Sequence, residues 1–182
     1  MIRSGILLLL FFIFARLAFA QDAITANGRH RVNGTWIFDE KRTDLRYKDL
    51  YRGETLEISY NDPELRIIRT LIGKNETKSA TLILFTDNRG EKNRPYPFNQ
   101  GLEVASDTGW DKNSLIRTYT IKYYKSGKVV GGGTTKETYA ISEDGNTLTI
   151  IEESRVKFTS SSLYEPRIDD KGKSKRVYAR KM

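Results

Sequence analysis

Carboxylates are the side chains of this sequence that could carry out acid–base chemistry. Glu137 shares a predicted strand face with Tyr139, so it would point into a buried interior. A buried glutamate with a raised pKa can act as a general acid or base, whereas a partner such as Arg117 would make it a structural ion pair. We favour the ion pair. Glu152 and Glu153 are adjacent, so a strand would send them to opposite faces and at most one can enter that interior.

The remaining motifs point away from catalysis. His30 is the only histidine and the chain has no cysteine, so catalytic triads and metal sites built on these residues lack partners. Three consecutive glycines at 131–133 lack the spacing of a phosphate-binding loop, and we interpret them as a bulge or sharp bend in a strand. We therefore expect no catalytic residue, no bound metal and no cofactor.

The first twenty residues predict export. Arg3 precedes an apolar run at 6–15, and Ala18-Phe19-Ala20 follows, which is the pattern of a secretory signal peptide. The run is too short to cross a bilayer, so we expect a soluble protein that does not span the membrane. An exported chain without cysteine fits a bacterial periplasm or exterior. We expect a signal peptide at 1–20, a polar leader at 21–32 and one domain at 33–182.

The positive net charge alone does not identify or exclude a class of partner. The formal charge is +8, yet basic and acidic residues are interspersed along the chain. No nucleic-acid-binding motif is present, and an exported protein rarely meets cytoplasmic nucleic acid. We therefore expect no nucleic-acid partner.

Short segments rich in Thr, Ile, Val, Tyr and Phe, separated by Gly, Asn and Asp, predict an all-β chain. Tight turns at 125–128 and 143–146 predict hairpins between sequential strands. Such a meander forms a single antiparallel up-and-down barrel of about nine strands, because closure removes exposed edges; an open sandwich is the alternative. We expect strands near 34–39, 54–60, 64–72, 78–86, 102–108, 114–125, 128–142, 147–158 and 175–181.

Three segments of the chain match a known pattern. They are Asn33-Gly34-Thr35-Trp36 with Asp39 and Lys41, the stretch 142–150, and Arg176-Val177-Tyr178. Together they resemble small exported bacterial proteins with a lipocalin-like (calycin-type) β-barrel, most of which have no assigned role. The resemblance covers about residues 33–180 and implies an up-and-down barrel, a fold that commonly holds a small apolar ligand. Gly34 and Trp36 match the lipocalin Gly-x-Trp, and Arg176 or Arg180 could match the arginine of the last strand.

Trp36 and one of these arginines could form a structural latch. A tryptophan near the start of the domain buries a large surface, and a guanidinium from the final strand can lie over its ring. This contact would fasten the first strand to the last. We favour this structural role over contact with a ligand.

Two segments could contact a partner. The connection 87–101 is long and contains Tyr96 and Phe98, which could cover a barrel mouth or pack on the outside. A basic cluster within 169–176 could meet an anionic lipid headgroup or an envelope polymer, although such clusters usually solvate a hairpin end.

The expected function is binding of a small apolar or amphipathic molecule inside the barrel, as an exported carrier or sensor, with Arg117 fixing a polar or acidic end. One alternative is a binding module for another envelope protein or polymer, working through loops or the outer face without an internal ligand. A less favoured alternative is an enzyme that uses Glu137 and a tyrosine. The expected ligand-binding residues are Tyr60, Leu84, Tyr96, Phe98, Arg117, Tyr119, Tyr123 and Tyr139.

Overall fold

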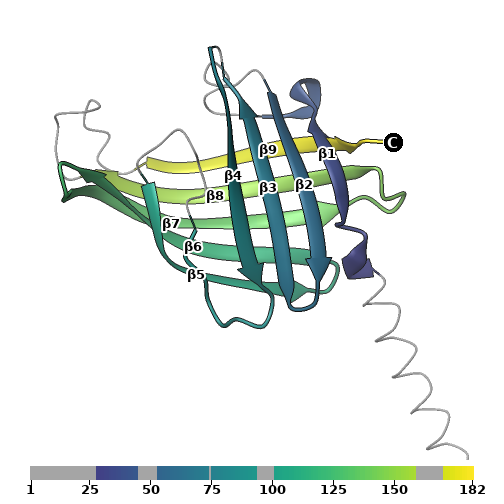
Figure 1. Ribbon diagram of the computed structural model, residues 1–182, viewed down its shortest axis with the longest axis horizontal. Helices are drawn as coiled ribbons and strands as arrows, with labels where there is room; N and C mark the ends of the chain where they lie inside the picture. Colours follow the sequence, from purple (N-terminus) through teal and green to yellow (C-terminus); the bar gives the residue numbers. More distant parts are fainter. Residues whose placement is uncertain (1–27, 45–52, 74, 94–100, 159–169) are drawn as a thin grey trace, which may run out of the picture.

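The computed structural model describes residues 28–44, 53–73, 75–93, 101–158 and 170–182, and these form a nearly closed antiparallel barrel (Figure 1). A short 3-10 helix, η1 (Glu40–Arg42), follows the first strand. The strands are β1 (Gly34–Phe38), β2 (Gly53–Asn61), β3 (Glu64–Ile72), β4 (Thr77–Phe85), β5 (Gly101–Asp111), β6 (Ser114–Lys125), β7 (Lys128–Ile141), β8 (Thr147–Phe158) and β9 (Asp170–Arg180).

The strand order is β4-β3-β2-β1-β9-β8-β7-β6-β5, with antiparallel pairing between neighbours. The predicted all-β, up-and-down barrel is therefore confirmed. Each predicted strand has a counterpart, but β9 begins at Asp170 rather than near 175. The lysines and glycine at 171–173 look like a polar turn in the sequence, whereas their backbone pairs with β8 in register, Lys173 opposite Glu153.

The seam of the barrel lies between β4 and β5, the two ends of the sheet order. The segment after β4 bridges it with side-chain hydrogen bonds. Asn93 mimics a strand residue, because its amide accepts from the Ile83 N–H at 2.9 Å and donates to the Ile83 carbonyl at 3.0 Å. On the other side, the Thr108 hydroxyl donates to Glu91 Oε1 at 2.7 Å. The predicted loop residues Tyr96 and Phe98 lie outside the described residues.

One half of the interior is packed with apolar side chains, because alternate strand residues point inward. We call this set the apolar cluster: Val32, Trp36, Leu56, Ile58, Tyr60, Leu65, Ile67, Leu82, Leu84, Leu115, Tyr139, Leu148, Ile150 and Tyr178. Residues 28–32 lie against this half. The Arg29 guanidinium lies 5.8 Å from the Trp110 ring, and the exposed His30 ring lies 5.5 Å from Tyr60.

The glycine run at 131–133 lies beside an irregularity of the β6–β7 pairing and at a close approach of β7 to β8. The three glycines pair in register with Ile121, Lys122 and Tyr123, and the β6–β7 register shifts directly beside the run, between Tyr123 and Tyr124, so the irregularity falls at Val130 rather than within the glycines. At Gly133 the neighbouring backbone comes so close that an added Cβ would lie 2.1 Å from the carbonyl oxygen of Arg155 on β8. Only glycine fits at this point of the barrel wall.

Arg180, not Arg176, lies over Trp36. Trp36 is fully buried and pairs with Arg180 across the β1–β9 ladder, and the guanidinium carbon is 4.2 Å from the ring centroid. The same side chain donates to the Asn33 carbonyl at 2.6 Å and the Gly145 carbonyl at 2.7 Å. Gly34 leaves room for it, because a Cβ there would lie 2.6 Å from Nη1. Arg176 points instead into the middle of the barrel.

Replacing Arg180 should loosen this junction of the first and last strands. We expect Arg180→Met to lower the free energy of unfolding by about 2 kcal/mol, since it removes the ring contact and charged hydrogen bonds to two carbonyls. Urea unfolding measures the change. The exposed neighbour Lys181 provides the control, and equal stability of Arg180→Met and Lys181→Met would show that the contact stabilises nothing.

Candidate functional site

A layer of buried charges crosses the barrel next to the apolar cluster. We call it the ion layer: Glu54, Arg69, Arg117, Glu137, Glu152 and Arg176. Each comes from an inward position of a different strand, and all are buried except Glu152, whose side chain is 21 % exposed. Three guanidinium groups face three carboxylates, which offsets the large desolvation cost of burying charge.

Arg176 connects the two sides of the ion layer. Its Nη2 donates to Glu137 Oε1 at 3.0 Å and to Glu152 Oε2 at 3.3 Å, and its Nη1 lies 3.8 Å from Glu54 Oε2. Glu54 also accepts hydrogen bonds from Arg69 Nε and, at 2.8 Å, from the Tyr178 hydroxyl. One arginine of β9 thus joins carboxylates from β2, β7 and β8.

Glu137 is held as a structural ion pair. Its Oε2 accepts from Arg117 Nη1 at 3.3 Å and from the Tyr139 hydroxyl at 2.9 Å, while Oε1 accepts from Arg176. This is the arrangement that we favoured over a catalytic acid. Arg117 also lies over Tyr119, with 4.3 Å between the guanidinium carbon and the ring centroid.

Burial raises the pKa of three tyrosines in this region well above the ordinary value. Desolvation is the main cause for Tyr119, Tyr139 and Tyr178, and a nearby carboxylate adds to it. That carboxylate is Glu137 for Tyr119 and Tyr139, and Glu54 for Tyr178. The folded protein therefore keeps these phenols protonated at pH values where an unfolded chain would ionise them.

This difference predicts alkaline instability. Because the folded-state pKa is the higher one, the stabilisation is complete below the unfolded pKa near 10 and is lost as the pH rises above it. Each tyrosine should lower the free energy of unfolding by about 1.4 kcal/mol per pH unit in that range. Urea unfolding between pH 8 and 11 measures the slope. Tyr178→Phe should reduce the slope above pH 10, and an unchanged slope would contradict this interpretation.

Beyond the ion layer, the exposure of inward residues differs between strands: Tyr119, Ile121 and Thr135 on β6 and β7 stay buried, whereas inward residues of β8 and β9 become partly exposed. On β8, the inward residues Leu148 and Ile150 are buried, whereas Ser154 and Val156 are only half-buried. On β9, Tyr178 is buried and Ser174 is half-buried. The register assigns the same face to the members of what we call the open half: Tyr119, Ile121, Tyr123, Gly133, Thr135, Ser154, Val156, Gly172 and Ser174.

The predicted ligand-binding residues lie at three depths of the barrel. Tyr60 and Leu84 are in the apolar cluster. Arg117 and the Tyr139 hydroxyl belong to the ion layer, and Tyr119 lies directly above it. Tyr123 is the predicted residue that lies farther into the open half. The described residues of the predicted set therefore do not form one continuous lining.

The sequence interpretation included the Arg117–Glu137 ion pair and allowed one of Glu152 and Glu153 inside, but it missed Glu54 and Arg69 and assigned Arg176 or Arg180 to the latch. Glu54 lies two residues from Leu56 on β2, and Arg69 lies two residues from Ile67 on β3, so each shares the inward face with a buried apolar residue. This spacing could have predicted that both charged side chains are buried. The sequence interpretation also missed the small, half-buried inward residues of β8 and β9, such as Ser154 and Ser174.

A hollow on the outer surface of the barrel, metal sites and membrane-spanning helices were the other features to consider. A hollow of about 300 Å³ is lined by Asn88, Asp107, Gly109, Trp110, Asp111, Ile116 and Thr118. Within the described ranges, no group of three or more His, Cys, Asp or Glu side chains could hold a metal ion. In that same part of the chain, no helix has the length and apolar character to cross a bilayer.

Comparisons with known proteins identify neither a family nor a ligand for this chain. No family model matches the chain, and no curated protein matches it. A solved structure of a mutant of the "REP1-NXSQ fatty acid transporter" aligns with a TM-score of 0.44 and 10 % sequence identity, covering 82 % of this chain and 98 % of that one. A structural similarity this low carries no argument about the ligand of this protein. The function must therefore be inferred from the residues inside the barrel.

Proposed function

We propose that this protein is an exported carrier or sensor that binds a small amphipathic molecule in the open half of its barrel. The observation that carries the proposal is the change in exposure along β8 and β9. On these two strands, inward positions are buried up to the ion layer and half-buried beyond it, at Ser154, Val156 and Ser174, while facing inward residues of β6 and β7 such as Tyr119 and Thr135 stay buried. A barrel of this strand number can hold one small ligand when its interior side chains are small.

The open half offers an apolar wall above a charged floor. Val156 on β8 is half-buried, and the buried side chains of Tyr119 and Ile121 on β6 complete the apolar wall. The most exposed member of the ion layer is the Glu152 carboxylate, whereas the Arg117 side chain is 1 % exposed. The expectation that Arg117 fixes an acidic end is therefore less favoured than a head group with hydrogen-bond donors, such as an alcohol or an amine, placed against Glu152.

Binding can be tested by obstructing the interior. The chain from Gln21 is titrated with N-phenyl-1-naphthylamine, a neutral apolar amine whose fluorescence rises in apolar surroundings. Ser174→Phe places a ring on the inward face and should weaken binding at least about tenfold. Lys175→Phe places the same ring on the exposed outer face of β9 and should leave binding unchanged. Unaltered binding by a folded Ser174→Phe protein would contradict the proposed site.

Tests of the head group follow from the floor of the site. A long-chain alcohol or amine should displace the probe at lower concentration than the carboxylic acid of equal chain length, because the acid would bring a second negative charge to Glu152. Glu152→Gln should reduce the difference between the concentrations of acid and of alcohol or amine that displace the probe. A preference for the acid would return Arg117 to the role predicted from the sequence.

A further inference from the structure

We infer that the β6–β7 hairpin tip and a neighbouring basic band dock this protein on an anionic lipid bilayer. The tip is residues 124–130. Pairing between β6 and β7 continues to Lys125 and Lys128, while the described parts of β5 and β8 reach Gly101, opposite Tyr123, and Phe158, opposite Gly131. Among the described residues, the tip extends past the ends of β5, β8 and β9 (Figure 1).

The tip exposes apolar surface. Val129 is 50 % exposed, more than the exposed isoleucines Ile37 (45 %) and Ile72 (42 %). It pairs across the hairpin with the half-buried Tyr124. Exposed apolar residues at a hairpin end favour a partner that covers them.

Cationic side chains gather on the outer face of the same sheet. The basic band consists of Lys122, Lys136, Arg155, Lys157, Lys173 and Lys175, all exposed. Alternation places these residues on the face opposite the barrel interior, and the register brings them into adjacent rows, with Lys122 and Lys157 both opposite Gly132. On this face of β6–β9, Glu153 is the one described acidic residue, and Lys173 Nζ already pairs with it at 2.9 Å.

The combination favours a bilayer over a soluble polyanion. An anionic polymer needs only the lysines. A bilayer interface also accepts tyrosine and valine, while long lysine side chains such as Lys128 reach the headgroups. Tyr123, at the base of the tip, faces into the open half, so docking would bring the accessible end of the barrel to the lipid surface. Docking itself does not depend on a bound ligand.

Vesicle binding tests this surface. The chain from Gln21, which lacks the apolar signal peptide, is sedimented with phosphatidylcholine vesicles and with vesicles containing one third phosphatidylglycerol. Binding should require the anionic lipid and weaken at high salt. Lys122→Gln combined with Lys157→Gln should reduce partitioning about twentyfold, and Val129→Ser about fivefold. Ile37→Ser, which removes a similarly exposed residue from β1, should have no effect.

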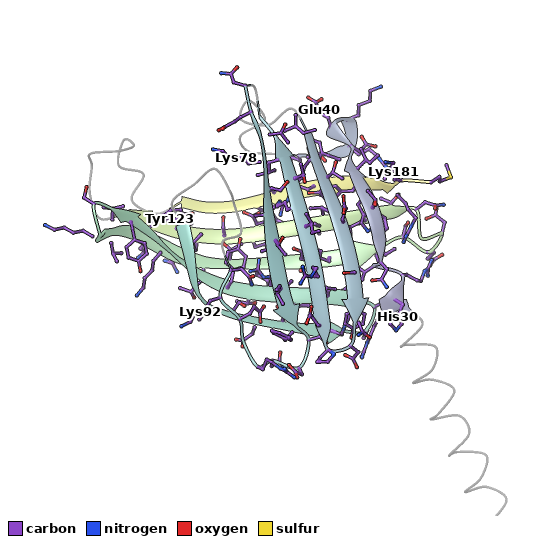
Figure 2. All side chains as sticks on the ribbon, in the orientation of Figure 1. His30, Glu40, Lys78, Lys92, Tyr123 and Lys181 are labelled. Atoms are coloured by element: carbon purple, nitrogen blue, oxygen red, sulfur yellow. The ribbon has the colours of Figure 1, made fainter. Side chains whose placement is uncertain are left out.

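A fluorescent label locates the contact. Because the chain has no cysteine, Lys128→Cys accepts a single environment-sensitive dye at the tip, and Lys181→Cys accepts it at the opposite end of the view in Figure 2, far from the labelled Tyr123. Anionic vesicles should shift the emission to the blue only at position 128. Absence of vesicle binding, or binding unaffected by Val129→Ser, would overturn the inference. Equal affinity for soluble polyphosphate would overturn it in favour of a polymer. None of these assays contains a ligand, so their failure leaves the proposed function untouched.

Discussion

Gly133→Ala is expected to prevent the native barrel from forming or to destabilise it by more than about 3 kcal/mol. The added Cβ would lie 2.1 Å from the Arg155 carbonyl oxygen and 2.7 Å from Val156 Cα. Both are backbone atoms, so no side-chain rotation can relieve the overlap. The β7 and β8 backbones would have to separate where Gly133 pairs with Val156.

The measurement is urea unfolding, with circular dichroism as a check on strand content. Gly53→Ala is the matched control, because Gly53 also lies in a strand but an added Cβ would meet only the Ile72 side chain, at an ordinary 3.5 Å. Its free energy of unfolding should change by less than about 1 kcal/mol. If both variants were equally stable, the close approach of β7 and β8 would be wrong.

Arg176→Met is expected to cost about 3–5 kcal/mol of stability, because it leaves buried carboxylates without their shared cation. Glu137 and Glu54 would keep their other donors, but the ion layer would carry excess negative charge in a region that excludes water. Lys175→Met, at the exposed adjacent position, should change the free energy of unfolding by less than about 0.5 kcal/mol.

A second substitution distinguishes charge from packing. Glu137→Gln removes one carboxylate charge with little change of shape, so Arg176→Met combined with Glu137→Gln should be more stable than Arg176→Met alone. If the double variant lost the sum of the two single effects, the two residues would not be coupled and the ion layer would have no role as a network.

The strand pattern was predictable because it depends on local alternation. In β6, Leu115, Arg117, Tyr119 and Ile121 all lie at most 2 % exposed, as the period of two required. The site of the seam was not predictable in this way. Whether β4 pairs with β5, or β1 with β9, depends on strands far apart in the chain, and no local residue pattern records it.

The position of each inward side chain along the barrel axis could not be predicted either. Alternation assigns a side chain to a face but does not say how far along the barrel axis it lies, so Tyr60 and Tyr123 looked equivalent although one is packed in the apolar cluster. Arg176 and Arg180 were equivalent for the same reason. The β1–β9 register decides between them, since it places Trp36 opposite Arg180 and leaves Arg176 beside Glu137.

The most direct test of the proposed function is native mass spectrometry of the protein after expression with residues 1–20 in a bacterial host. Any molecule that denaturation releases from the protein is then identified. We predict a chain that begins at Gln21 and carries one small amphipathic molecule, which Ser174→Phe loses and Lys175→Phe retains. A protein that is empty when isolated, and still empty after exposure to host lipid extracts, would contradict the proposal that its open half is a binding site.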